Sequence, residues 1–115
     1  MPNPLRKTDF TTLTVASGQT VSQYLELGGY DLLGITVPSN FDGTTIGFQV
    51  SPDGTTFSVV NDGESGDLSI TCAASRYVPM KNVALLAGAL ALKLTTGTVQ
   101  SVSNTVFTMH LREIQ

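Results

Sequence analysis

The chain has 115 residues, of which 41% are hydrophobic and 13% are charged, and its formal net charge is -3 at pH 7. This length predicts one domain with a single core, and the charged fraction is about half of the usual quarter. The scattered Lys and Arg residues exclude a nucleic-acid-binding protein, which needs clustered basic side chains. No apolar run approaches the ~20 residues of a membrane helix, and the N-terminus lacks the apolar segment of a signal peptide. We therefore expect synthesis in the cytoplasm and no membrane partner.

Ser and Thr take the place of the missing charged residues. Thr favours strands, and a neutral Thr-rich exterior can lie against another protein without desolvating ions. This composition favours a protein that works in an assembly. A small monomer with a Thr-rich surface is the alternative that composition leaves open.

The first segment, residues 1–9, contains two prolines and few apolar residues. It predicts an extended N-terminal arm ahead of a domain over residues 10–115. Because such arms are often ordered only by a partner, we expect partner contacts along it. The residues expected to make these contacts are Pro2, Asn3, Pro4, Leu5, Arg6 and Lys7.

Short runs of β-type residues then follow one another, separated by turns rich in Gly, Asn, Asp and Pro. The first run, residues 10–15, alternates less cleanly at Phe10 than at Leu13 and Val15, and we expect a β-bulge there. Further strands are expected at residues 20–27, 32–37, 45–51, 57–60, 68–72, 76–80, 89–95 and 105–112. The strand at 76–80 is expected at a sheet edge, because Pro79 has no N–H to donate to a neighbouring strand.

Residues 44–60 contain the strongest hairpin signal in the chain. Ile46, Phe48 and Val50 alternate with polar residues or glycine, and Pro52-Asp53-Gly54 interrupts the pattern. Asp and Gly tolerate left-handed backbone conformations, so the chain is expected to reverse here. The return strand is expected to run through residues 57–60.

Helix and strand compete in residues 81–94, where Ala and Leu are frequent. We expect one short helical turn at residues 82–86 and then a strand. The whole chain therefore predicts an all-β fold, a single β-sandwich of eight or nine short antiparallel strands. The pattern leaves open whether the topology is jelly-roll or Ig-like.

Acidic residues gather between the predicted strands, and Asp62, Glu64 and Asp67 stand within six residues. Loops of this kind can bind calcium, but the spacing is not that of an EF-hand, and Asp-Gly pairs are ordinary turn chemistry. We assign no metal and no other cofactor. His110 is the only histidine and Cys72 the only cysteine, so no catalytic unit can be assembled around either. The sequence predicts a non-enzymatic protein.

The run IGFQVSPDGTTFSVVNDGESGDLSITCAASRYVPM, followed by LAGALALKL and a last strand ending HLREI, resembles small virion proteins of tailed bacteriophages. The resemblance covers about residues 33–112. Thr95 and Thr96 replace a basic residue of the family pattern, so a charged contact at that loop is not carried over. The matching residues are Ser51, Asp53, Gly54, Phe57, Ala73 to Val78, Leu92 to Leu94 and Gly97.

This resemblance implies a structural role in the virion. The favoured form is a capsid decoration or cement protein, often a homo-oligomer and most simply a trimer, that binds the major capsid protein or another virion protein. A neck, tail, baseplate or fibre-anchoring component is the first alternative. A glycan-binding module that uses the loops at one end of the sandwich is the second, although the chain has no Trp and only three Tyr residues.

Overall fold

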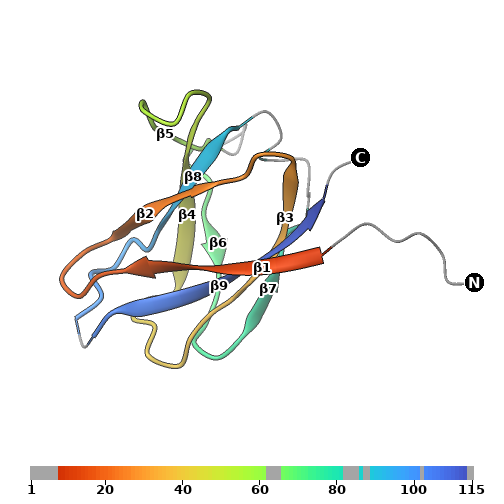
Figure 1. Ribbon diagram of the computed structural model, residues 1–115. Helices are drawn as coiled ribbons and strands as arrows, with labels where there is room; N and C mark the ends of the chain where they lie inside the picture. Colours follow the sequence, from red (N-terminus) through yellow and green to blue (C-terminus); the bar gives the residue numbers. More distant parts are fainter. Residues whose placement is uncertain (1–7, 62–65, 82–85, 87–88, 102, 114–115) are drawn as a thin grey trace, which may run out of the picture.

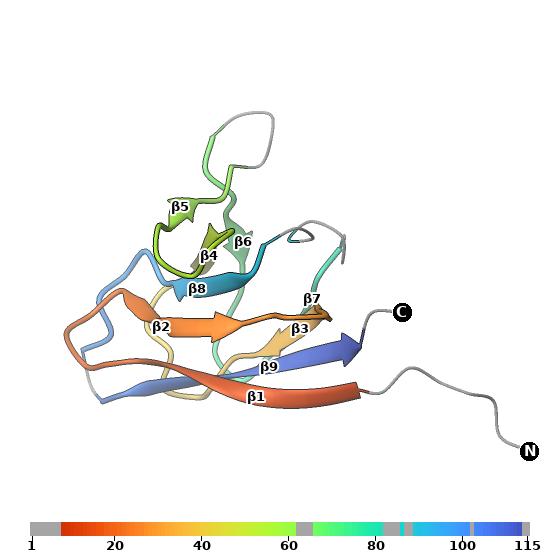
Figure 2. The same cartoon turned by 45° about the horizontal axis from the view of Figure 1, so that its top comes forward.

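The computed structural model describes residues 8–61, 66–81, 86, 89–101 and 103–113. These residues form nine strands and no helix, and therefore no helix that could cross a membrane. The strands make two antiparallel sheets that lie face to face (Figures 1 and 2), which confirms the predicted β-sandwich. The strands are β1 (Thr8–Val15), β2 (Val21–Glu26), β3 (Tyr30–Thr36), β4 (Thr45–Ser51), β5 (Ser58–Val59), β6 (Ile70–Thr71), β7 (Tyr77–Pro79), β8 (Ala91–Thr95) and β9 (Thr105–Glu113).

The strand order selects between the two topologies that the sequence left open. Sheet A has the order β1-β9-β3-β7, and sheet B has the order β2-β8-β4-β5, with β6 also paired to β4. The pairs β1 with β9, β2 with β8, β3 with β7 and β4 with β5 are nested, as in a jelly roll. An Ig-like sandwich would order its strands differently.

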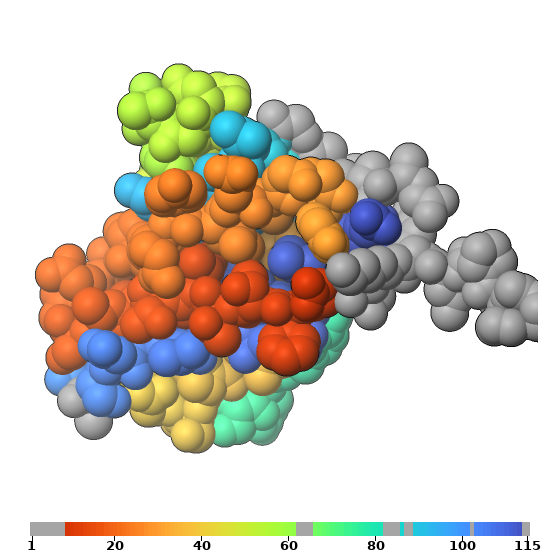
Figure 3. Space-filling view, in the orientation of Figure 1, coloured from red at the N-terminus to blue at the C-terminus, as the bar shows by residue number. Residues whose placement is uncertain are grey.

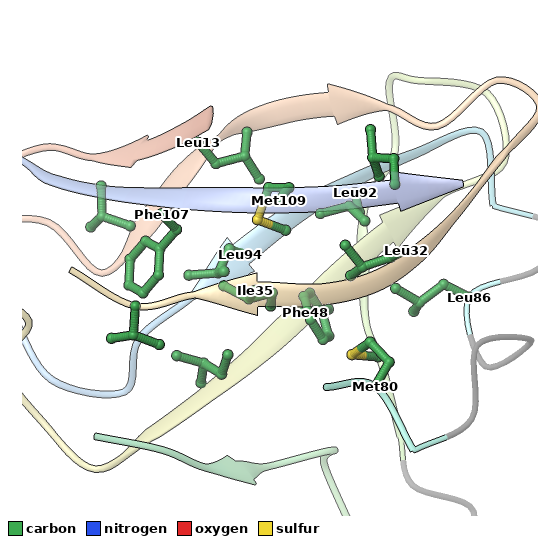
Figure 4. Packing of buried hydrophobic residues seen from close by; sticks show 14 of the residues in the cluster. Leu13, Leu32, Ile35, Phe48, Met80, Leu86, Leu92, Leu94, Phe107 and Met109 are labelled. Carbon is green, nitrogen blue, oxygen red and sulfur yellow. The ribbon is translucent and has the colours of Figure 1, made fainter. Parts of the chain in front are cut away.

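The core lies between the two sheets and is made by the inward-facing residues of every strand except β5 (Figure 4). Strand β9 shows the principle, because Phe107, Met109 and Leu111 are buried while Val106 is exposed. Burying a side chain of this size contributes about 1.5–3 kcal/mol. The alternation seen in the sequence of β9 therefore decides which of its faces packs on sheet B.

Strand β1 differs from the prediction in two ways. It pairs with β9 without any register shift, so the bulge predicted near Phe10 is wrong. The pattern broke because Phe10 faces solvent and is 67% exposed. The strand also starts at Thr8, so Thr8 and Asp9 of the expected arm are paired in sheet A, while residues 1–7 lie outside the described residues.

A bulge does occur in β2, where the register with β8 shifts between Val21 and Tyr24. Ser22 is buried there, and its Oγ accepts a hydrogen bond from the Leu94 N–H at 2.9 Å. The side chain thus replaces the backbone acceptor that the bulge removes from the ladder.

The predicted hairpin is confirmed, with Gln49 opposite Val59 and Val50 opposite Ser58. Of the competing segment at 81–94, Ala91–Thr95 is a strand, as expected. Residues 82–85 of the predicted helical turn lie outside the described residues, and Leu86 lies in a turn with its side chain buried.

One end of the sandwich is joined by the fully buried side chain of Gln100. Its Nε2 donates to the carbonyl oxygens of Asp42 and Thr98 at 2.8 and 2.9 Å. Its Oε1 accepts from the Asp42 N–H and from the Thr105 hydroxyl, both at 2.9 Å. An amide side chain has two donors and two acceptor positions, so every one is used.

The backbone of Gln100 extends this network to the turn between β1 and β2. The Gly18 N–H donates to the Gln100 carbonyl at 2.7 Å, and the Gln100 N–H donates to the Gln19 carbonyl at 3.1 Å. Asp42 Oδ2 also accepts from the Ser101 N–H at 3.0 Å. We call this end of the sandwich the Gln100 end; it fixes three loops relative to one another.

Candidate functional site

The residues predicted to bind a partner, and most of the acidic residues weighed as a calcium loop to which no metal was assigned, lie outside the described residues. These are Pro2, Asn3, Pro4, Leu5, Arg6 and Lys7 of the arm, and Asp62 and Glu64 of the acidic loop. Asp67 is described; it is exposed and forms an isolated bridge with Asn61. Within the described residues, no three His, Cys, Asp or Glu side chains come together as a metal site.

Asp53 is engaged in shaping the β4–β5 turn. Its Oδ1 accepts from the N–H groups of Thr55 and Thr56 at 2.9 and 3.1 Å, and from the Ser51 hydroxyl at 2.8 Å. These hydrogen bonds, with those from the backbone of Thr55 and Thr56 first, lower the pKa of Asp53 from 3.8 to about 2. Gly54 follows with φ of 82°, a conformation that favours glycine. The Pro52-Asp53-Gly54 motif is therefore a structural turn.

Cys72 and His110 both lie in surroundings that suit structural residues. Cys72 is half-buried against the core, and burial raises the pKa of its thiol above the usual 9.0, which reduces the reactive thiolate. His110 is on the outer face of sheet A, where its Nε2 shares a hydrogen bond of 2.7 Å with Thr36 Oγ1.

Three rings form a row across the outer face of sheet A, which we call the aromatic row: Phe10, His110 and Tyr77. Phe10 is opposite His110 in the β1–β9 register, and the Tyr77 ring contacts the His110 ring edge to face, with centroids 5.1 Å apart. Tyr77 is 52% exposed. Its ring lies over Gly34, where an added Cβ would overlap the Tyr77 hydroxyl. Glycine at position 34 is what makes room for the row.

The neighbouring row on this face consists of hydroxyl side chains. Thr12 is opposite Thr108, and Thr108 is opposite Thr36. Among the described residues of this face, charge occurs at one end, where Arg112 Nη2 and Asp31 Oδ2 are 3.6 Å apart. Interfaces between proteins are enriched in aromatic residues and depleted of charge at their centres. The outer face of sheet A has this composition.

A groove of about 720 Å³ opens on the side of the sandwich where β6 and β7 lie. The two strands belong to different sheets, and they diverge from the turn that joins them (Figures 1 and 2). Five of its lining residues belong to the core or pack against it: Leu68, Ile70, Cys72, Val78 and Met80. Tyr77 also lines this β6–β7 groove, so the groove borders the aromatic row.

The opposite side of the sandwich is closed. Strands β1 and β2 are in contact there, and Figure 3 shows them next to each other on the face in view. The Thr14 N–H in β1 donates to Gln23 Oε1 in β2 at 3.0 Å. The core is thus covered along β1 and β2 and reached from solvent along β6 and β7.

A smaller cluster lies on the outer face of sheet B. The rings of Tyr24 and Phe57 have centroids 6.3 Å apart, and Lys93 Nζ lies 4.5 Å from the centre of the Phe57 ring. The Lys93 charge therefore has an aromatic partner on the surface. This cluster ties the β4–β5 turn to β2 and β8.

Sequence reasoning missed the aromatic row, the β6–β7 groove and the Gln100 end. Each is made by residues from strands or loops far apart in the chain; Asp42 and Gln100, for example, are 58 residues apart. The one local signal was Pro79, which predicted an edge strand. The sheet order confirms this prediction, because β7 lies at the edge of sheet A. An edge strand can border a groove, but it does not reveal one.

Comparisons with models of protein families, with curated proteins and with solved structures find no match for this chain. The residues that carry the resemblance to phage virion proteins lie at turns and in the core: Ser51 to Phe57 at the β4–β5 turn, Ala73 to Val78 at the start of β7, and Leu92 to Leu94 in β8. Most of these residues support the fold, whereas Arg76 and Tyr77 are exposed, so a function has to be argued from the surfaces.

Proposed function

We propose that the chain is a non-enzymatic structural protein of a tailed-phage virion, and specifically a decoration protein that binds the outside of the assembled head. The observation that carries the proposal is the outer face of sheet A. It combines the exposed rings of Phe10 and Tyr77 with threonines, and its described charges are confined to the Arg112–Asp31 pair. Such a face can pack on another protein while few ions lose water.

The jelly roll supplies a rigid body for this role. Two sheets with a single core and the fully satisfied Gln100 end hold the outer face in one shape. A preformed surface loses little conformational entropy when it binds. A protein that binds only the assembled head stabilises that head by mass action.

Oligomerisation belongs to the same proposal. A homo-oligomer, most simply a trimer, would place several such faces against neighbouring copies of the major capsid protein. In this arrangement the residues ahead of β1 would reach onto a neighbour. Deletion of residues 1–9 is expected to leave a folded domain that no longer binds capsids; because Thr8 and Asp9 are paired in β1, deletion of residues 1–7 alone is the matched control for lost strand pairing.

The copy number in purified particles tests the proposal. Quantitative mass spectrometry of virions is expected to find one copy of this chain for about every one to three copies of the major capsid protein, because decoration follows the symmetry of the head. A stoichiometry of only a few copies per particle would assign the chain to the neck, tail or baseplate. Absence from the particle would overturn the virion role.

A glycan-binding module is the second candidate. The exposed rings of Phe10 and Tyr77 are the observation that favours it, because flat aromatic surfaces can stack on sugars. A glycan array probed with the whole chain separates the two. Binding to a defined glycan that is lost in Tyr77→Ala would support this candidate, whereas an array without hits would exclude it.

A further inference from the structure

The β6–β7 groove exposes the flank of the core. Leu68, Ile70 and Val78 are only partly buried, although they pack against the buried cluster. Its volume of about 720 Å³ lies within the range of specific ligand sites. A ligand that places apolar side chains in this groove would therefore complete the burial that β1 and β2 achieve on the other side.

The charges at the groove are unusual for this acidic chain. Two cations line it, Arg76 before β7 and Lys81 after it, and no Asp or Glu is among its described lining residues. The other two described cations have partners, since Arg112 is paired with Asp31 and Lys93 lies over the Phe57 ring. Arg76 Nη1 donates to the carbonyl oxygens of Ala74 and Ser75 at 3.5 and 3.4 Å, but neither Arg76 nor Lys81 has a carboxylate partner in the described part of the chain. They are about 16 Å apart along an extended strand.

The free backbone edge of β6 faces away from β4. The N–H groups of Leu68 and Cys72 donate to Val60 and Thr44 at 2.7 and 2.9 Å. Since alternate residues of a strand direct their backbone groups to opposite sides, those of Ser69 and Thr71 point away from β4. The edge of β7 is less suited to pairing, because Pro79 has no N–H to donate.

We propose that the β6–β7 groove binds an extended segment of another protein, with alternating apolar side chains and a carboxylate near each end. The segment pairs with the free edge of β6, its apolar side chains fill the groove, and its carboxylates meet Arg76 and Lys81. This is strand addition, a recurrent mode of peptide recognition. The site does not depend on the partner being a virion protein.

The arm of a second copy is a poorer occupant. Residues 1–7 contain Arg6 and Lys7, which would meet the like charges of the groove, and Pro2 and Pro4, which lack N–H groups. Charge complementarity therefore selects an acidic segment from a different protein.

Fluorescence anisotropy with the whole chain tests the proposal. The probe is the labelled peptide acetyl-Asp-Val-Thr-Ile-Thr-Asp-amide, and two control peptides carry Lys in place of both Asp residues or N-methyl groups on alternate amides. Each control is expected to bind at least about tenfold more weakly, because it loses the ion pairs or the backbone hydrogen bonds. The peptide is also expected to slow alkylation of Cys72, which lines the groove.

Variants of the protein provide the reciprocal test. The double variant Arg76→Glu and Lys81→Glu changes two exposed side chains and is expected to bind the acidic peptide at least about tenfold more weakly and the Lys peptide more tightly. Lys93→Glu, on the outer face of sheet B, is the matched control and is expected to leave binding unchanged. Circular dichroism confirms that each variant is folded.

Three results would overturn the proposal. One is equal binding of the acidic and Lys peptides. Another is unchanged binding by the double variant. The third is failure of the acidic peptide to bind at about 1 mM while a peptide with the sequence of residues 1–7 does bind, which would identify the arm of a second copy as the occupant.

Discussion

The Gln100 end and the β6–β7 groove differ in whether their polar and apolar groups find partners within the chain. At the Gln100 end, polar groups from three loops meet around the buried side chain of Gln100, which forms hydrogen bonds with four of them. At the groove, apolar side chains and a strand edge reach the surface, and the lining cations have no carboxylate partner in the described chain. The polar groups at the Gln100 end have their partners within the chain. The groove instead presents apolar side chains, a strand edge and cations that a second molecule could contact.

This difference separates stability from recognition. A buried polar network contributes to one rigid structure, because each lost partner leaves a group unsatisfied. Exposed edges and apolar grooves contribute little to folding and are retained where they bind something. Substitutions at the Gln100 end should therefore affect the free energy of unfolding, and substitutions at the groove should affect binding.

The largest effect on stability is expected for Gln100→Leu. The substitution keeps much of the buried volume but leaves the backbone of Asp42 and the Thr105 hydroxyl without partners, which should cost about 3 kcal/mol or more. Urea unfolding measures the cost. Gln19→Leu is the matched control, because Gln19 is exposed and uses its backbone in this network; it should cost less than about 0.5 kcal/mol. Equal costs would show that the network adds no stability.

Gly34→Ala is expected to have the next largest effect. The new methyl group would overlap the Tyr77 ring above Gly34 and would also lie 2.9 Å from the Val78 carbonyl. Relieving the overlap should cost about 1–3 kcal/mol and should move Tyr77 off His110, which NMR of the His110 ring would detect. In a Tyr77→Ala background the cost should be smaller. A cost that is independent of Tyr77 would contradict this arrangement of the aromatic row.

A smaller and pH-dependent effect is expected for Asp53. Its pKa is lowered to about 2 in the folded chain, so its ionised form stabilises the fold above its ordinary value of 3.8. This contribution should be lost as the pH falls from about 3.8 through about 2. Unfolding of Asp53→Asn should accordingly depend less on pH in this window than unfolding of the parent. Asp67→Asn, at another exposed aspartate, is the control, and an identical pH profile for the parent and Asp53→Asn would refute the role of Asp53.

The smallest effect on stability is expected at the groove itself. Arg76→Glu and Lys81→Glu change exposed side chains that have no carboxylate partner among the described residues, so the free energy of unfolding should change by less than about 0.5 kcal/mol. Thermal and urea unfolding of the double variant measure this change. A large loss of stability would mean that Arg76 and Lys81 stabilise the fold, as Gln100 does, and would contradict the distinction between the two regions.

The sequence predicted the elements of the fold better than their arrangement. Alternation identified the strands, as in β9, where Phe107 and Met109 are buried, and turn chemistry identified the β4–β5 hairpin. A strand pattern does not say which strand is its neighbour, so the nested topology was not predictable. The bulge predicted near Phe10 was wrong because an exposed aromatic residue on the outer face was interpreted as a break in the alternation of inward-facing residues.

The candidate surfaces depend on that missing information. The aromatic row joins residues of β1, β9 and β7. It exists because Phe10 is opposite His110 and because the Tyr77 ring, whose backbone is opposite Thr36, reaches over Gly34 to the His110 ring. The groove exists because β6 and β7 join different sheets. The sequence predicted the two lining segments as consecutive strands. Local sequence signals do not show whether consecutive strands join the same sheet or different sheets.

A reconstruction of the tailed-phage particle to which the proposed function assigns this chain tests the account most directly. We expect many copies of this chain on the outside of the head, with the outer face of sheet A against another protein and an extended segment of a neighbour in the β6–β7 groove. A chain bound with its groove open to solvent would overturn the docking proposal alone. A particle that lacks the chain would contradict the virion role.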